Sequence, residues 1–224
     1  MSKAVPVIAI DGPSGAGKGT ISRQVAAALG YHLLDSGALY RLTALSAADR
    51  GVALDDEAAL AELARDLEVQ FDSNDDGSEH ILLAGVDVTL AVRREQTGAW
   101  ASQVAAIGVV REALLVRQRA FQQAPGLVAD GRDMGTHVFP SATLKIFLTA
   151  SAEERARRRH KQLKDKGIGV SLAALSRDIE DRDRRDTERS VAPLRPAEDA
   201  RMLDSSGKSI EAVTQMVLDW VREL

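Results

Sequence analysis

Short apolar runs alternate along this chain with longer segments whose hydrophobic residues recur at helical spacing. The strand-length runs occupy residues 5–10, 31–35, 126–130, 143–148 and 200–204. Such runs are typical of strands that are buried on both faces of a parallel sheet. After the first run, Ile21, Val25 and Leu29 lie one turn apart, and Gly30 is placed to end that helix. The pattern therefore predicts an α/β fold with a five-stranded parallel sheet flanked by helices.

Two segments interrupt this alternation. Residues 68–92 contain short strand-like runs, a polar turn at 73–77 and a bend at Gly85, which predicts a small antiparallel insertion. Residues 155–189 contain twelve Lys and Arg against seven Asp and Glu, few apolar positions, and the glycines Gly167 and Gly169. A mixed-charge helix is normally a solvated face. The segment as a whole favours a mobile, arginine-bearing lid that closes over phosphates.

Composition narrows the class of protein. The chain of 224 residues fits one domain, and its net charge of −4 argues against a general nucleic-acid coat protein. With no cysteine, disulfides and thiolate metal sites are excluded, and the histidines lack ligand spacing. No run approaches the length of a membrane span, and no leader pattern precedes the first strand. We expect a cytoplasmic monomer without nucleic-acid or membrane partners.

The most informative stretch is the glycine-rich run at residues 11–20, which follows the first predicted strand and opens the first predicted helix. Glycines let successive backbone N–H groups point at a polyphosphate, and a lysine adds a positive charge for its β and γ oxygens. The run thus predicts a phosphate loop (P-loop) for ATP, with Gly12, Pro13, Ser14, Gly15, Ala16, Gly17, Lys18, Gly19 and Thr20 as binding residues. The Ser or Thr that usually follows the lysine is displaced by one position, because Gly19 precedes Thr20.

Four carboxylates end predicted strands: Asp11, Asp35, Asp130 and Asp204. One such Asp is usually a turn former, whereas several at the carboxyl edge of a parallel sheet suggest a polar active-site rim. For Asp130, a turn role and a role in holding Mg²⁺, directly or through water, both remain open.

Phosphoryl transfer depends on positioning, charge neutralisation and exclusion of water, so arginines in the lid are candidates to contact the transferred group. Besides Lys18, the residues chosen for this catalytic role are Arg158, Arg182 and Arg185.

Several blocks together resemble bacterial cytidylate kinases, which belong to the nucleoside monophosphate kinase class. They lie at residues 11–20, 34–41, 101–105, 110–114, 129–136 and 181–193. The glycine loop is shared by many kinases, whereas Asp-Ser-Gly-Ala at 35–38 and Asp-Gly-Arg-Asp-Met-Gly at 130–135 are more particular to this family. The resemblance implies transfer of the γ-phosphate of ATP, used with Mg²⁺, to CMP and dCMP.

The resemblance also implies an acceptor site. Its phosphate clamp would be Arg41, Arg132 and Arg189; its base contacts Ser36, Arg111 and Asp133; its sugar contacts Ser102, Arg182 and Asp186, with Tyr40 alongside. Cytosine suits such a base pocket, since a carboxylate accepts from its amino group while Arg and Ser donate to its acceptors. Uracil would leave a carboxylate facing a carbonyl oxygen.

The same reading divides the chain into a core (about 1–35, 108–154 and 190–224), a monophosphate-binding insertion (about 36–107) and a lid (about 155–189). Alternatives remain: a P-loop kinase for UMP, AMP or a non-nucleotide alcohol, or a P-loop ATPase or binding module. A regulatory GTPase would need an Asn-Lys-x-Asp stretch, and the single asparagine, Asn74, lies in an acidic turn.

Overall fold

The computed structural model describes residues 4–73, 79–165 and 169–224. The chain forms two compact units, one made of Met1–Asp35 and Arg119–Leu224, the other of Ser36–Gln118. Most of the polar turn expected at 73–77, and Gly167 of the expected lid, lie outside the described residues.

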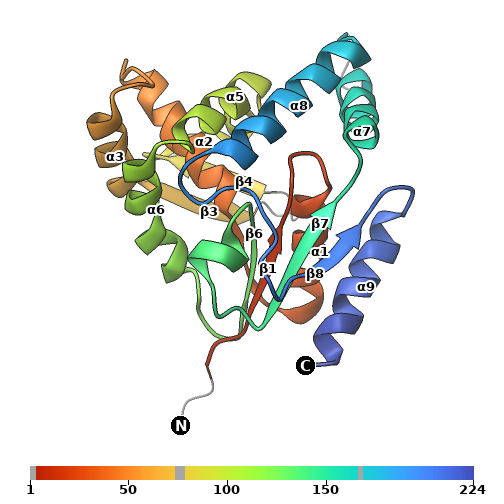
Figure 1. Cartoon of the computed structure of the whole chain (residues 1–224). Helices are drawn as coiled ribbons and strands as arrows, with labels where there is room; N and C mark the ends of the chain where they lie inside the picture. Colours follow the sequence, from red (N-terminus) through yellow and green to blue (C-terminus); the bar gives the residue numbers. More distant parts are fainter. Residues whose placement is uncertain (1–3, 74–78, 166–168) are drawn as a thin grey trace. The chain divides into compact units, whose positions relative to one another are not determined.

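The first unit is built on a five-stranded sheet in the order β2-β6-β1-β7-β8, and every neighbouring pair is parallel (Figure 1). The order places β1 at the centre, so the segment that follows it leaves the middle of the carboxyl edge. The predicted five-stranded parallel sheet is confirmed, with strands β1 (Val7–Asp11), β2 (His32–Asp35), β6 (Leu127–Gly131), β7 (Leu144–Thr149) and β8 (Arg201–Asp204).

Helices α1 (Lys18–Leu29) and α9 (Ile210–Arg222) cover one face of this sheet. Ile8 and Ile10 of β1 point to that face and pack with side chains such as Val25 and Val217. Gly30 ends α1 in the left-handed conformation (φ 65°), as its position in the sequence predicts. The apolar runs and the apolar positions of these two helices thus form a buried core between the sheet and the helices.

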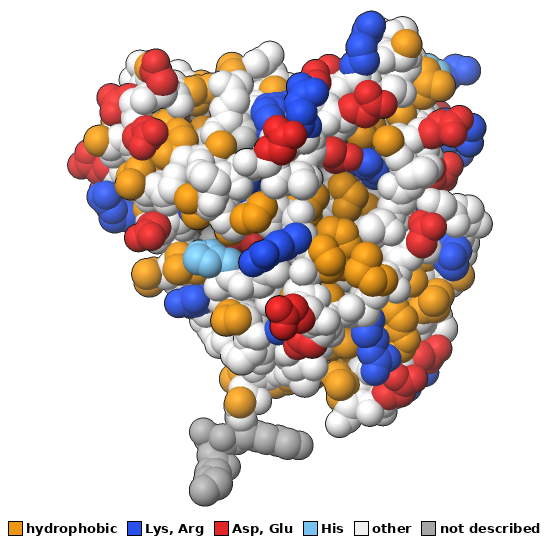
Figure 2. Space-filling model, viewed as in Figure 1, with side chains coloured by type: hydrophobic (Ala, Val, Ile, Leu, Met, Phe, Trp, Pro, Cys, Tyr) orange, Lys and Arg blue, Asp and Glu red, His pale blue; other side chains and the backbone are white. Residues whose placement is uncertain are grey.

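Two further helices, α7 (Ala152–Asp165) and α8 (Leu172–Glu188), span most of the arginine-rich segment. These two helices pack on each other, and Ala156, Leu163 and Leu175 are buried. The segment therefore buries apolar side chains although its composition is highly charged. Charges of both signs are interspersed over the face in view (Figure 2). The unit also contains a short π-helix, η1 (Met134–Val138), directly after β6.

The second unit contains a three-stranded antiparallel sheet in the order β3-β4-β5, which confirms the predicted insertion of short antiparallel strands. Gly85 occupies the tight turn before β5 with φ 78°. The elements are α2 (Ser36–Asp49), α3 (Glu57–Arg65), β3 (Val69–Ser73), β4 (Glu79–Leu83), β5 (Val86–Asp87), α4 (Thr89–Val92), α5 (Glu95–Val104) and α6 (Gly108–Ala120).

Across residues 4–73, 79–165 and 169–224, no single helix has the length and apolar character needed to cross a membrane. Helices α5 and α6 have that length and composition only when taken together, and the two are bent by 103° relative to each other.

Candidate active site

The glycine-rich segment forms a loop between β1 and the first turn of α1. Gly15 and Gly17 adopt left-handed conformations with φ of 80° and 96°, which side chains with a Cβ rarely allow. Gly17 is the N-terminal cap of α1 and offers no side chain to the free N–H groups of that helix. An uncapped helix N-terminus behind a glycine loop binds phosphate groups readily, so the geometry supports a nucleotide phosphate site.

Lys18 lies buried at the start of α1. Its Nζ donates to the carbonyl of Pro13 at 3.0 Å and lies 3.9 Å from Oδ1 of Asp130. Burial lowers the pKa of Lys18 to about 8; the charge of Arg132 adds to this, and Asp130 opposes it. Burial likewise raises the pKa of Asp130 to about 6, against the charge of Lys18. A bound polyphosphate would supply negative charge that this buried lysine can stabilise.

Gly19 lies close to the carboxylate at the end of β6. A Cβ at this position would lie 3.3 Å from Oδ2 of Asp130, closer than an ordinary contact. A Ser or Thr at position 19 would therefore crowd Asp130. This gives a steric reason for the glycine at this position and for the displacement of the hydroxyl to Thr20.

Asp11, at the start of the phosphate loop, is hydrogen-bonded to the segment after β6. Its two carboxylate oxygens accept from the backbone N–H groups of Met134 and Gly135, both at 2.8 Å. Burial raises the pKa of Asp11 to about 7 against these two hydrogen bonds, and the charge of Asp133 raises it further. Asp11 thereby holds the first turn of η1, which Asp133 precedes as the N-terminal cap.

The strand-end carboxylates differ in environment. Asp11 and Asp130 are buried at the carboxyl edge of the sheet, as expected for an active-site rim. Asp204 is exposed and accepts from the N–H of Ser206 at 2.8 Å, so it has the turn-forming role instead.

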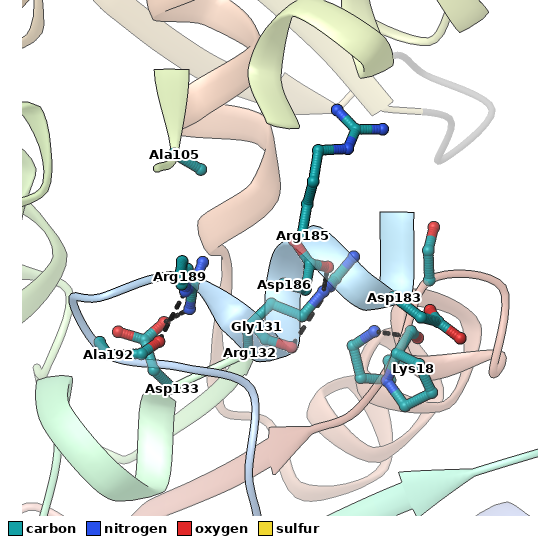
Figure 3. A network of polar contacts seen from close by, with 12 residues as sticks. Lys18, Ala105, Gly131, Arg132, Asp133, Asp183, Arg185, Asp186, Arg189 and Ala192 are labelled. Carbon is teal, nitrogen blue, oxygen red and sulfur yellow. Dashed lines mark hydrogen bonds and ion pairs between the residues drawn. The ribbon is translucent and has the colours of Figure 1, made fainter. Parts of the chain in front are cut away.

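Two ion pairs, each between an arginine and a carboxylate, join the segment after β6 to the end of α8 (Figure 3). Nε of Arg132 donates to Oδ2 of Asp186 at 2.9 Å. Burial opposes both charges, yet Arg132 keeps the pKa of Asp186 below its ordinary value, and Asp186 raises that of Arg132. Nη2 of Arg189 lies 3.6 Å from Oδ1 of Asp133, and both side chains are 4% exposed. The structure thus brings four of the expected acceptor residues together in the first unit.

The three arginines chosen for catalysis have different environments. Arg182 lies near enough to Lys18 for its charge to lower the pKa of that lysine. Arg158 donates to Oγ and O of Ser205 at 3.1 and 2.7 Å. Arg185 is exposed on α8 and extends away from Asp186 in Figure 3. Arg182 thus acts on the charge of Lys18, and Nη1 of Arg158 lies 3.9 Å from the place of a Cβ on Gly17 of the phosphate loop.

Sequence reasoning missed Arg155. This residue is 4% exposed, and its Nη1 donates to the carbonyl of Ser14 in the phosphate loop at 3.0 Å and to Oδ1 of Asp183 at 3.0 Å. Nothing in the spacing of Arg155 distinguishes it from the neighbouring arginines at 157, 158 and 159. Arg155 differs from these arginines only in its position, because it lies in the first turn of α7, next to the phosphate loop.

In the second unit, Arg41 lies on helix α2 and reaches α4 and α5. Its Nη1 donates to the carbonyl of Val92 at 2.9 Å. A Cβ added at Gly98 would lie only 3.2–3.5 Å from three atoms of the Arg41 guanidinium. The lack of a side chain at Gly98 therefore leaves space for this guanidinium. A partly exposed arginine beside a helical glycine is suited to holding an anion.

The other expected residues of the second unit lie on α2, α5 and α6. The guanidinium of Arg111 is 5.7 Å from the ring centre of Tyr40 and donates to the carbonyl of Ala105 at 3.1 Å. Ser36 donates to Oε1 of Gln118 at 2.7 Å. Within the part of the chain that the structure describes, the buried hydroxyl of Ser102 makes no hydrogen bond. A buried hydroxyl of this kind has capacity for a ligand.

The described ranges 4–73, 79–165 and 169–224 contain no group of three or more His, Asp or Glu side chains arranged to hold a metal ion.

Comparison with known proteins identifies the family. The family model described as "Cytidylate kinase" matches residues 8–223. The chain is 62% identical over 224 residues to the cytidylate kinase of Stutzerimonas stutzeri, covering 100% of this chain and 98% of that protein. It is 61% identical to the cytidylate kinase of Pseudomonas paraeruginosa, covering 97% and 96%.

Among solved structures, an uncharacterized protein from Eubacterium ventriosum superimposes with a TM-score of 0.53 at 10% identity, covering 98% of this chain and 99% of that one. At this identity the likeness concerns the fold alone. The match of the family model to nearly the whole chain, together with relatives that are similar over their full length, shows that this chain belongs to the cytidylate kinase family.

Proposed function

We propose that this chain transfers the γ-phosphate of ATP to CMP and dCMP, giving ADP with CDP or dCDP. The observation that carries the proposal is the buried group of charges at the carboxyl edge of the sheet. There Lys18 of the phosphate loop shares its surroundings with Arg132, which is itself paired with Asp186. A nucleoside monophosphate kinase needs such positive charge for both the donor and the acceptor phosphates.

For the donor, we assign ATP binding to residues 12–20. The backbone N–H groups of the loop and of the first turn of α1 would hold the β- and γ-phosphates, and Lys18 would stabilise the charge that develops during in-line transfer. Arg182 is the first candidate to contact the transferred group, because its charge acts on Lys18. Arg158 and Arg185 remain predictions for this role.

Mg²⁺ would enter with ATP and would neutralise charge on the phosphate oxygens. Carboxylate and hydroxyl oxygens fit this ion. The pKa of Asp130 is raised to about 6 by burial, so this group ionises near neutral pH beside the loop. We therefore expect Asp130 to hold Mg²⁺, either directly or through water, with Thr20 as the second candidate.

For the acceptor, we assign the monophosphate to Arg41, Arg132 and Arg189, and the sugar to Ser102, Arg182 and Asp186, with Tyr40 alongside. The base contacts would be Ser36, Arg111 and Asp133. Arg111 and Asp133 are both 3% exposed, so a mismatched base would leave buried polar groups without partners. Each such group costs about 1–3 kcal/mol, which favours cytosine over uracil.

The division into core, insertion and lid, a monomeric state and a cytoplasmic location belong to the same proposal. Sedimentation velocity of the purified chain would test the monomer, and a single species of 24.0 kDa is expected.

Steady-state assays with ATP-Mg²⁺ and a panel of CMP, dCMP, UMP and AMP test the activity. We expect the highest kcat/KM with CMP and dCMP. If UMP or AMP were preferred, the chain would be a kinase for another acceptor, and the base assignment would fall. ATP consumption without a phosphorylated acceptor would instead indicate an ATPase.

A further inference from the structure

We propose that Arg155 and Asp183 form a positioning pair that fixes helix α8 against the phosphate loop and thereby places Arg182 beside Lys18. The inference rests on the proposed transfer reaction for its assay. It adds two residues that the acceptor and donor assignments above do not include.

Arg155 is held on several sides. Its Nε donates to the carbonyl of Ala150 at 3.0 Å, and its Nη1 donates to the carbonyl of Ser14 at 3.0 Å. The methylene groups of its side chain lie directly under Gly15, where an added Cβ would come within 3.3–3.8 Å of them. The guanidinium thus touches the donor loop while its stem supports the loop from below.

Asp183 completes this arrangement from α8. Its two oxygens accept from Nη1 and Nη2 of Arg155 at 3.0 and 2.5 Å, which is the bidentate geometry of a strong pair. Only 5% of the Arg155 side chain and 27% of the Asp183 side chain are exposed. A pair with this degree of burial is little screened by solvent, and losing one partner leaves a buried charge.

The position of Asp183 within α8 gives the pair its function. Arg182 directly precedes it, and Asp186, which pairs with Arg132, follows one helical turn later. Since the helix is rigid over this distance, the bond from Asp183 to Arg155 sets the height and rotation of Arg182 relative to the loop, whereas Asp186 is held by its own bond from Arg132. A displacement of about 1 Å in such a group can lower the rate of a positioned reaction about 10²-fold.

The same helix offers a matched control. Asp181 pairs with Arg184 at 2.6 Å, but both side chains are more than half exposed, at 55% and 62%. Exposed pairs of this kind contribute little to stability. Asp181→Asn therefore removes one carboxylate from α8 without removing a contact to the phosphate loop.

The test compares Asp183→Asn with Asp181→Asn in the CMP assay, together with the Kd for ADP. We expect Asp183→Asn to lower kcat by about 30- to 100-fold. Its Kd for ADP should change less than about threefold, because the loop and its hydrogen bond from Arg155 remain. Asp181→Asn should retain wild-type values. Equal kcat values for the two variants would overturn the proposal.

A double-mutant cycle separates positioning from a general loss of structure. If Asp183 acts by placing Arg182, the Asp183→Asn substitution should lower kcat less than about threefold when Arg182 is already replaced by alanine. A general structural defect would lower kcat by the same factor in both backgrounds, and that result would refute the proposal.

If Asp183→Asn does not fold, as judged by circular dichroism, Asp183→Glu serves in its place. The longer side chain keeps the charge but moves the carboxylate by one methylene, so a kcat about tenfold lower is expected. An unchanged kcat would count against the pair. Failure of the wild type to phosphorylate CMP would instead refute the proposed function, and this is seen before any variant is compared.

Discussion

Replacing Asp11 with Asn should change how the stability of the protein depends on pH. Burial raises the pKa of Asp11 from an ordinary 3.8 to about 7. Between these two values the folded protein holds a proton on this group and the unfolded chain does not. The free energy of unfolding contributed by Asp11 therefore falls as pH rises, by about 1.4 kcal/mol per pH unit until the folded pKa is approached.

The magnitude can be worked from this window. Between pH 5 and pH 7 the contribution of Asp11 falls by about 2 kcal/mol, since the slope weakens near the folded pKa. Asn carries no titrating charge, but its NH2 group would face one of the two backbone N–H groups that Asp11 accepts from. Asp11→Asn should therefore be less stable than the wild type near pH 5, and its stability relative to the wild type should rise by about 2 kcal/mol between pH 5 and pH 7.

Urea unfolding at pH 5, 6, 7 and 8 measures the difference. The chain has 2 tryptophans, Trp100 on α5 and Trp220 on α9. In a Trp100→Phe background, the fluorescence of Trp220 reports on the unit that contains Asp11. Parallel pH profiles for the variant and its parent, or a relative stability of the variant that falls from pH 5 to pH 7, would refute the reasoning.

Asp204→Asn is the matched control, because it replaces another strand-end carboxylate that is exposed. The backbone N–H of Ser206 lowers the pKa of Asp204, so its contribution to stability is present above the ordinary pKa and is lost only on acidification. From pH 5 to pH 8 this variant and its parent should differ by a constant amount.

Three further substitutions test the site. Lys18→Met should abolish phosphoryl transfer while circular dichroism shows a retained fold, and full activity would remove the lysine from the phosphate loop's function. Asp133→Asn should lower kcat/KM for CMP by about 5- to 150-fold, since a buried acceptor costs about 1–3 kcal/mol to lose; unchanged kinetics would exclude it from the base pocket. Gly98→Ala should raise the KM for CMP several-fold, because the new Cβ would lie 3.2 Å from the guanidinium of Arg41, whereas an unaltered KM would show that Arg41 tolerates displacement.

Much of the fold could be predicted because its signals are local. The apolar runs lie within one or two residues of the strands, and Gly30 ends α1 as its position indicates. The glycine loop is recognisable for the same reason, since its conformation and its function both depend on ten consecutive residues.

The supporting contacts could not be predicted because they join residues far apart in the chain. Asp11 accepts hydrogen bonds from residues more than 120 positions away, and Arg155 pairs with Asp183 across 28 positions. The sequence predicted Arg158, Arg182 and Arg185 alike, because it shows charge but not the direction of a side chain. Burial separates these arginines, and burial is a property of the assembled sheet and helices.

The central position of β1 has a consequence for the order in which the protein forms. Both of its neighbours, β6 and β7, begin more than a hundred residues later in the chain. During synthesis β1 therefore has no flanking strand until residue 131 has left the ribosome, and it lacks the second until residue 149 has left. The second unit is continuous from Ser36 to Gln118 and has its own sheet and helices. We expect it to fold first, so that a nascent chain acquires nucleotide binding only late in translation.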